Sequence, residues 1–417
     1  MSNRTLLHIS FILIILLGIS SGAVAQIHMA GLVDIELRKG GADSSPYTNQ
    51  SPGDKLSLFT PNVRLFLSGN ISDQWFVSSV LQSDYYNSKE LHPPFFSVLS
   101  LNFTPHPDSD SDFMATIGRF VTPYGAYSKR LLSSNNPFVH LPLTHASGLP
   151  VTKHFGFVNT NSNNYNDPYY YNLNNVYFSN ETGLTMVYQR MYTQGIKISG
   201  SLGENNTFNY NLAATLAPAS SHFEYGEYDT PSFIGRVTLQ PAMWARLGLS
   251  YSSGPFMKKG NINRNIFSDN DLSSYTQRLI GADVRLSYHY YTVLMEYNHS
   301  YWEAPLVNLP PGNPITLIYP SREATIDHLS GEFVVDLPFW VGSYAAIRYE
   351  ALLSGEMDNY TSVYNGDSWT YDRRRIEFAA GYSLHRNITL KASYLYSDDS
   401  GPNLDDNVIA LQLSVLF

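Results

Sequence analysis

The end of the chain alternates between two kinds of side chain. Read with a period of two, residues 407–417 place five large apolar side chains on one face: Ile409, Leu411, Leu413, Val415 and Phe417. The opposite face is smaller and more polar, apart from Leu416. About 9–11 residues are what a tilted β-strand needs to cross a bilayer. The pattern therefore predicts a membrane-crossing strand, although any half-buried antiparallel strand alternates in this way.

The same period recurs along the chain, with almost no helical periodicity. Charged residues fall repeatedly on the smaller face, as Asp34, Glu36 and Arg38 do. In a soluble sandwich that face would meet solvent, whereas in a membrane barrel it lines the lumen. We predict eighteen strands, at 27–38, 56–68, 73–86, 94–104, 112–121, 171–179, 183–191, 195–203, 207–217, 231–240, 243–253, 275–288, 290–303, 323–337, 341–354, 370–384, 388–398 and 407–417. The first of the pair 171–179 and 183–191 is rich in Asn, a poor strand former, and without the pair the count is sixteen.

The lengths of the connections favour the membrane barrel. Short turns alternate with long polar connections, at 39–54, 218–230, 254–274, 304–322, 355–369 and 399–406. Outer-membrane barrels have this arrangement, with short periplasmic turns and long extracellular loops. We predict an all-β fold, a transmembrane antiparallel β-barrel of 16–18 strands, wide enough to hold an aqueous channel. A secreted or periplasmic β-sandwich or adhesin is the alternative.

The first 25 residues have the layout of a secretory signal peptide. Arg4 precedes an apolar run, and small residues ending in Ala23-Val24-Ala25 follow it. The run is shorter than the ~20 apolar residues of a membrane-spanning helix. We therefore predict a signal peptide at 1–25 and a single barrel domain at 26–417, exported through the periplasm to the outer membrane.

Composition narrows the class further. Charged residues make up 15% of the chain, below the ~25% of soluble domains, and aromatics reach 14%, led by 31 Tyr. Many aromatics suit the two interfacial belts of a barrel. The net charge of −9 argues against a nucleic-acid partner. The chain has no Cys, which excludes Cys-type metal sites and c-type haem, and we predict neither cofactor nor metal.

Two segments resemble a known family. The run from Gly118 to Gly125 (GRFVTPYG), followed by Lys129-Arg130 and Asn136-Pro137-Phe138, resembles a strand-to-loop passage of Gram-negative porin-like outer-membrane proteins. The terminal strand resembles the one whose final Phe, here Phe417, is read by the barrel assembly machinery. The resemblance implies a barrel in outer-membrane lipid, a loop after the fifth strand that folds into the pore, and frequent homotrimers.

The connection at 122–170 is far longer than the usual four to six residues. It carries Lys129, Arg130, Lys153 and three His against a single acid. Inside the lumen this positive field would favour anions. The alternative is an exterior loop that contacts lipopolysaccharide or a neighbouring protomer. We predict that Lys129, Arg130 and Lys153, with Arg119 at the base of the loop, line the pore constriction.

Opposed charges on the predicted inward faces are the second candidate feature. They would set up a transverse field across the lumen, or pair with one another and brace the wall. We predict these lumen-lining residues: Arg38, Arg64, Arg236, Arg246, Arg285, Arg348, Arg375, Glu296, Glu332, Glu350 and Glu377.

Catalysis has weak support in the sequence. The Gly-x-Ser-x-Gly match at 18–22 falls in the predicted signal peptide, and His328 and Ser330 suit ordinary lumen residues. We predict no enzyme but an outer-membrane porin, a passive channel for small hydrophilic solutes with a preference for anions. The alternatives are a transporter for hydrophobic substrates and a barrel that serves as an adhesion or anchoring surface. The predicted partners are outer-membrane lipid, a small hydrophilic solute, the barrel assembly machinery and further copies in a homotrimer.

Overall fold

The structure, a computed structural model, covers most of the predicted barrel. It describes residues 27–44, 54–84, 94–105, 113–130, 132–152, 156–159, 184–185, 187–188, 192–203, 207–220, 230–257, 272–308, 316–357, 368–400 and 404–417. The predicted signal peptide, the predicted strand at 171–179 and Lys153 lie outside these residues. None of the described helices is long and apolar enough to cross a membrane.

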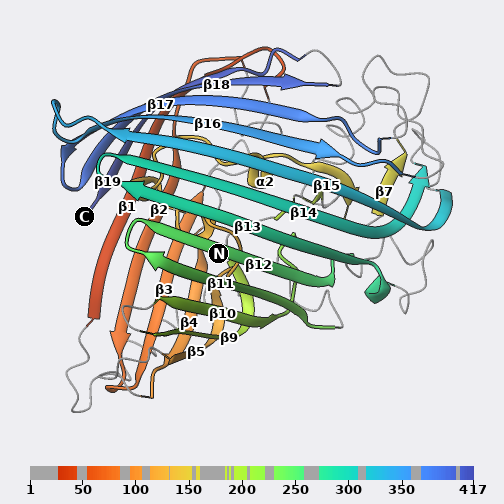
Figure 1. The fold of residues 1–417 in the computed structure, drawn as a ribbon, viewed down its shortest axis with the longest axis horizontal. Helices are drawn as coiled ribbons and strands as arrows, with labels where there is room; N and C mark the ends of the chain where they lie inside the picture. The colour runs from red at the N-terminus through yellow and green to blue at the C-terminus, as the bar shows by residue number, and fades with distance from the viewer. Residues whose placement is uncertain are drawn as a thin grey trace, which may run out of the picture.

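Sixteen of the strands form one closed antiparallel barrel (Figure 1). They are β1 (Ile27–Gly40), β2 (Ser57–Asn70), β3 (Trp75–Asp84), β4 (Phe95–Phe103), β5 (Phe113–Val121), β9 (Tyr192–Leu202), β10 (Phe208–Thr215), β11 (Ser232–Ala242), β12 (Ala245–Pro255), β13 (Thr276–Tyr288), β14 (Tyr291–Asn308), β15 (Thr316–Asp336), β16 (Ser343–Ser354), β17 (Arg373–His385), β18 (Ile388–Asp399) and β19 (Val408–Leu416). Each barrel strand pairs with the next along the chain. The predicted fold class is confirmed, at the lower of the two strand counts.

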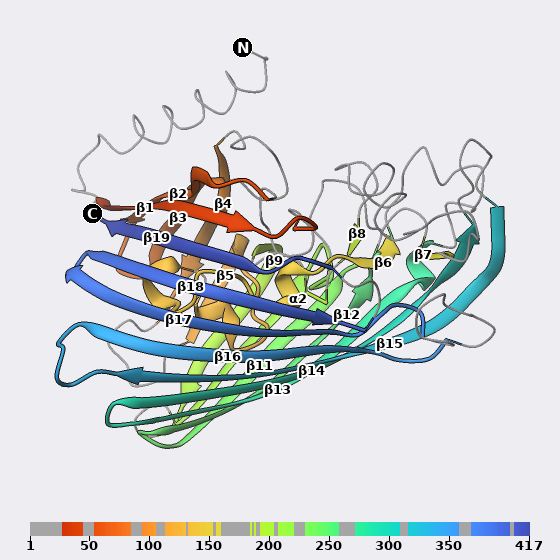
Figure 2. The same cartoon turned by 90° about the horizontal axis from the view of Figure 1, so that it is seen from above.

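The barrel closes between its first and last strands. Val33 of β1 lies opposite Val415 of β19, and Gly31 and Phe417 exchange two backbone hydrogen bonds of 2.6 and 2.8 Å. Figure 2 shows β1 and β19 side by side, with the C-terminus at one end of the barrel. We call this end the short-turn end, because tight turns such as the one between β11 and β12 lie there, and the opposite end the long-loop end.

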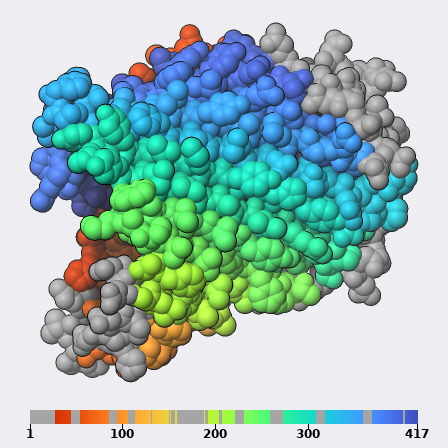
Figure 3. Space-filling model, viewed as in Figure 1, coloured from red at the N-terminus to blue at the C-terminus, as the bar shows by residue number. Residues whose placement is uncertain are grey.

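The two faces of the strands follow the predicted alternation. Ile409 of β19 and the terminal Phe417 are 58% and 69% exposed, whereas Gln412 and Ser414 on the other face of β19 are buried. In β1, Met29 is exposed and Asp34 is buried. Large apolar side chains therefore cover the outside of the wall. Figure 3 shows the face of the barrel to which β11 to β18 contribute.

Two strands extend much further than predicted. β14 has 18 residues and β15 has 21, so most of the loop predicted at 304–322 is strand, and that prediction is wrong. The misleading signal is proline, which occurs five times within 304–322. Pro305 falls where the β14–β15 register shifts, and a strand tolerates proline at such an irregularity because no ladder hydrogen bond is lost there.

The connection between β5 and β9 contains short elements: η1 (Tyr127–Lys129), η2 (Ser133–Asn135), α2 (Leu143–Ala146), β6 (Leu149–Thr152), β7 (Gly156–Asn159) and β8 (Leu184–Thr185). We call residues 122–148 the inner segment, Leu131 excepted, because their neighbours are the inward side chains of the wall. β7 pairs in parallel with the outer part of β14. β8 pairs with β6, so the described residues of the barrel strand predicted at 183–191 are not part of the wall.

Candidate permeation pathway

Carboxylates on the inner wall hold the inner segment through its backbone. Glu296, Glu350 and Glu377 belong to β14, β16 and β17, and all three are buried. Each accepts a backbone hydrogen bond: from Ala126 to Glu296 (3.2 Å), from Leu143 to Glu350 (3.0 Å) and from His140 to Glu377 (3.3 Å). The inner segment is thus held against the wall at β14, β16 and β17.

Arg348 balances these carboxylates. Its guanidinium lies 3.2 Å from Glu350, 2.5 Å from Glu377 and 3.7 Å from Glu332, and it is only 1% exposed. It also stacks over the ring of Phe138, with 4.6 Å from Cζ to the ring centroid. A guanidinium suits such a position because its planar group donates in several directions at once.

Further contacts fix the middle of the inner segment. Lys391 of β18 donates to the backbone oxygens of Ser133 and Asn136, the latter at 2.8 Å. Arg130 forms an ion pair with Glu332. The set predicted from sequence does not include Lys391, although the alternation within 388–398 puts it on the inward face.

A cavity of about 510 Å³ lies between the inner segment and the wall towards the short-turn end. Its lining holds six cationic side chains, Lys129, Arg130, Arg236, Arg246, Arg285 and Lys391, against three carboxylates, Asp283, Glu332 and Asp336. The formal excess is three positive charges. Two of the carboxylates are already paired, Glu332 with Arg130 and Asp283 with Arg236 at 2.6 Å.

Four of these cations form no ion pair with any residue that the structure describes: Lys129, Arg246, Arg285 and Lys391. Lys391 is held by backbone oxygens of the inner segment, so Lys129, Arg246 and Arg285 are the ones that do not hold the segment. Arg246 donates to the neutral Gln240 at 3.0 Å, and Arg285 donates to Ser287 at 3.3 Å. Lys129 lies in the connection rather than in a spanning strand, and burial together with the nearby Arg246 guanidinium lowers its pKa. The cavity therefore holds positive charge that the wall does not neutralise.

A second, smaller cavity of about 80 Å³ lies on the other side of the inner segment, against β1, β2 and β19. Its charges are mostly matched. Arg38 forms an ion pair with Glu36, and Asp34 accepts hydrogen bonds from Asn62 at 3.3 Å and from Ser133 at 2.5 Å. The inner segment thus separates a balanced cavity from a positive one.

The predicted site residues fall into distinct groups. The eleven predicted lumen-lining residues all lie on the inward face. Nine of them are buried, and the other two, Arg246 and Arg285, line the larger cavity. Lys129 and Arg130 line that cavity, and Lys153 lies outside the described residues. Arg119 departs from the prediction. It pairs with Leu99 in the ladder, on the outward face that it shares with Ile117, and stacks over Phe95 at 5.7 Å.

The histidines of the inner segment add little positive charge. His140 and His145 are both fully enclosed, and burial lowers the pKa of each, that of His145 to about 3. His328 lies between Asn298 and Glu350, at 3.2 and 3.4 Å, rather than beside a serine hydroxyl. Among the described residues, no three histidines or carboxylates are grouped as metal ligands would be.

The inward face is not polar along its whole height. At the long-loop end it carries large apolar side chains, including Trp302 of β14, Ile326 of β15 and Leu352 of β16, all at most 1% exposed. Inner-segment residues such as Leu143 and Tyr124 pack against them in one cluster. The alternation in the sequence indicated a polar inward face. It gives no sign of this cluster, because large apolar residues at the ends of these strands occur on both faces, and alternation alone does not assign them to the inward one.

Comparisons with known proteins agree with this architecture. No protein-family model and no curated protein matches the chain. Among solved structures, it is similar to the outer-membrane channel DcaP of Acinetobacter baumannii, with 12% identity over 95% of this chain and 99% of that chain and a TM-score of 0.57. It is also similar to OmpF of Salmonella typhi, solved with daunomycin, with 10% identity over 94% of this chain and 98% of that chain and a TM-score of 0.55. An anion-selective porin of Comamonas acidovorans shares 8% identity over 94% of this chain and 100% of that chain, with a TM-score of 0.52. The chain therefore has the fold of the porin-like outer-membrane β-barrels.

Proposed function

We propose that the protein is an outer-membrane porin, a passive and non-catalytic channel for small hydrophilic solutes that favours anions. The observation that carries the proposal is the group of Lys129, Arg246 and Arg285, cations without ion-pair partners around the larger cavity. Fixed charges near a constriction act strongly because low-dielectric walls focus their field. Sixteen strands also give a barrel of the size that holds an aqueous channel.

The wall carboxylates do not oppose this field strongly. Glu296, Glu350 and Glu377 accept backbone hydrogen bonds from the inner segment, and Arg348 lies against two of them. Screening at ~0.15 M salt limits exposed charges to about 8 Å. We therefore assign the selectivity to charges on the cavity itself. We further propose that residues 1–25 are a signal peptide, that 26–417 form one barrel domain, and that the barrel forms homotrimers.

A transporter for hydrophobic substrates is the second candidate. The apolar cluster at the long-loop end, with Trp302, Ile326 and Leu352, supports it. A route for apolar molecules would pass through such a cluster, whereas hydrated ions would avoid it.

Planar-bilayer recording tests the proposal. A porin inserts in discrete steps, each with a current proportional to voltage. Folding is checked by the shift in gel mobility that a barrel shows when boiled in SDS. A folded barrel that carries no current would contradict the porin and favour the hydrophobic-substrate candidate.

A further inference from the structure

The tips of two turns at the short-turn end are strongly apolar. Met243 and Trp244, between β11 and β12, are 97% and 53% exposed. Phe339 and Val341, between β15 and β16, are 83% and 85% exposed, and Trp340 lies between them. A turn that projects into an aqueous compartment normally carries polar residues, because exposed apolar side chains forfeit the gain from burial. These tips need an apolar environment.

The neighbouring turn between β17 and β18 is different. His385 and Arg386 are exposed there, and this turn is polar like those of ordinary barrels. The apolar tips therefore belong to one side of the rim, around β11 to β16.

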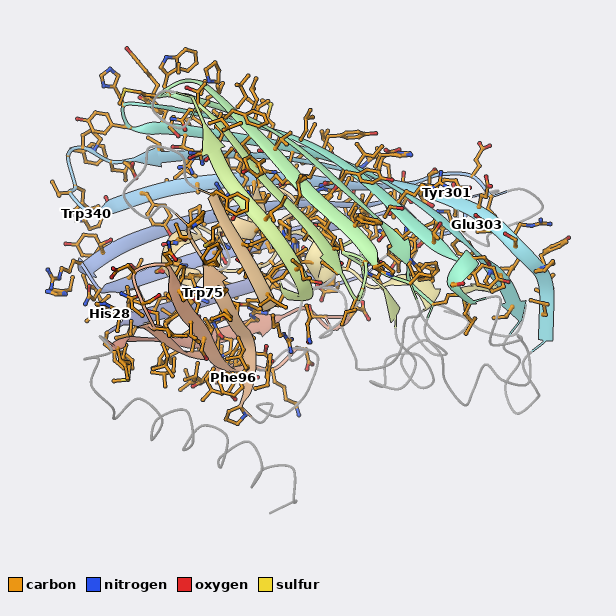
Figure 4. All side chains as sticks on the ribbon, turned by 90° about the horizontal axis from the view of Figure 1, so that it is seen from below. His28, Trp75, Phe96, Tyr301, Glu303 and Trp340 are labelled. Atoms are coloured by element: carbon orange, nitrogen blue, oxygen red, sulfur yellow. The ribbon has the colours of Figure 1, made fainter. Side chains whose placement is uncertain are left out.

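Polar groups mark the other limit of the apolar band on the same side. Asp327 of β15 lies on the outward face, where it accepts hydrogen bonds from Tyr297 at 2.6 Å and pairs with His299 at 2.8 Å. Beyond it, Arg278 lies over the ring of Tyr301 and Glu303 accepts a hydrogen bond from Ser321 at 3.1 Å. In Figure 4, Tyr301 and Glu303 lie at one end of the wall and Trp340 at the other.

The distance along β15 from its outward polar residue to its short-turn end locates the membrane. Asp327 and Asp336 lie nine residues apart in β15. At ~3.3 Å per residue and a tilt of ~35–45°, this length rises by about 21–24 Å. The apolar band of an outer-membrane barrel is about 25 Å tall. A band with Asp327 at its outer edge therefore reaches past Asp336 and into the turn that carries Phe339 and Val341.

We infer that the β11–β12 and β15–β16 turns are inserted among the lipid chains of the periplasmic leaflet, while the outer parts of β13 to β15 stand above the opposite leaflet. The partner of this surface is lipid, because the tips are apolar and because the band needs their height. The inference rests on the outer-membrane location contained in the proposed function.

Single-cysteine labelling tests the inference, since the chain has no Cys of its own. A nitroxide is attached to the single cysteine of each of four purified variants, which are then inserted into liposomes. The variants are M243C, F339C, L249C and R386C. Leu249 is 61% exposed on the outward face of β12 and serves as the lipid-facing control, and Arg386 is the turn control. Collisions with oxygen, which concentrates in lipid, are compared with collisions with a water-soluble nickel complex.

At positions 243 and 339 we expect a ratio of oxygen to nickel collisions close to that at 249 and several-fold above that at 386. A ratio at 243 and 339 equal to that at 386 would overturn the inference. Labels at 243 and 339 protected from both reagents would also overturn it, because they would show contact with a second copy of the protein. If position 249 is itself open to nickel, the membrane location fails, a result distinct from failure of the turn insertion.

Discussion

At the scale of single residues, attachment of the inner segment depends most directly on Arg348. This one guanidinium lies beside Glu332, Glu350 and Glu377 and is almost fully buried. Without Arg348, Glu350 and Glu377 would stay buried and would both lose the guanidinium that they contact. Arg130 also pairs with Glu332, so Glu350 and Glu377 are the carboxylates that depend most on Arg348.

We expect Arg348→Met to destabilise the barrel by about 3–5 kcal/mol, the usual cost of removing one partner of a buried ion pair. Urea unfolding in detergent micelles, followed by loss of the folded gel band, measures this cost. Arg374→Met is the matched control, since Arg374 is the exposed neighbour on β17. Equal stability of the two variants would contradict the role of Arg348, and Glu377→Gln should restore part of the loss in R348M.

Lys129 provides a test by pH. Its pKa lies below the ordinary 10.5, because burial and the Arg246 guanidinium disfavour the charged ammonium. Raising the pH therefore removes this charge before an ordinary lysine would lose its proton, and anion preference should weaken on the alkaline side below pH 10.5. Lys129→Arg keeps the charge and should retain its preference over the same range. Identical pH profiles for the two proteins would exclude Lys129 from the pathway.

At the scale of elements, the exit of the inner segment from the wall depends on two glycines. Gly118 of β5 lies opposite Gly195 of β9. Gly118 has a φ of +121°, and a Cβ atom there would lie 2.4 Å from the Leu99 carbonyl oxygen. A Cβ atom on Gly195 would lie 2.1 Å from the Ala214 carbonyl oxygen. Each close contact is with the strand on the other side of the glycine's own strand, β4 for Gly118 and β10 for Gly195. The β4–β5 and β9–β10 pairs therefore approach this closely only without side chains at these two positions.

We expect Gly118→Ala to lower the free energy of unfolding by about 1–3 kcal/mol, since alanine rarely adopts this backbone conformation. The control is Gly331→Ala in β15, where an added Cβ atom meets nothing within 4 Å. The urea midpoint of each variant measures the effect. A change at Gly118 no larger than that at Gly331 would show that the β4–β5 pair adjusts freely around this position.

The elements also show what a sequence can predict. The barrel strands follow from a pattern carried by each strand alone, so 388–398 and 407–417 agree with β18 and β19 nearly to the residue. Contacts of the inner segment, such as Leu143 with Glu350, join residues far apart in the chain, and alternation carries no signal for them. Arg119 had a usable signal, since Ile117 two residues earlier already marks its face as outward.

At the scale of the whole molecule, the lumen is divided by height. Apolar side chains such as Trp302 fill the lumen at the long-loop end. Below them lie the inner segment and the wall residues that hold it, the carboxylates and Arg348. Towards the short-turn end, the larger cavity is lined by cations in excess. This division predicts that neutralising Lys129, Arg246 and Arg285 changes which ions pass while leaving the folded barrel intact, because these three cations form no ion pair with the described residues.

The reversal potential of the channel in a salt gradient tests the account most directly. The measurement compares the natural protein with the triple variant K129Q/R246Q/R285Q, and with R278Q on the outward face as control. We predict an anion-selective potential for the natural protein and for R278Q, and a clear shift towards cations for the triple variant at unchanged heat stability. A triple variant that keeps the natural reversal potential would contradict the account, because it would place the cavity cations outside the path of the ions.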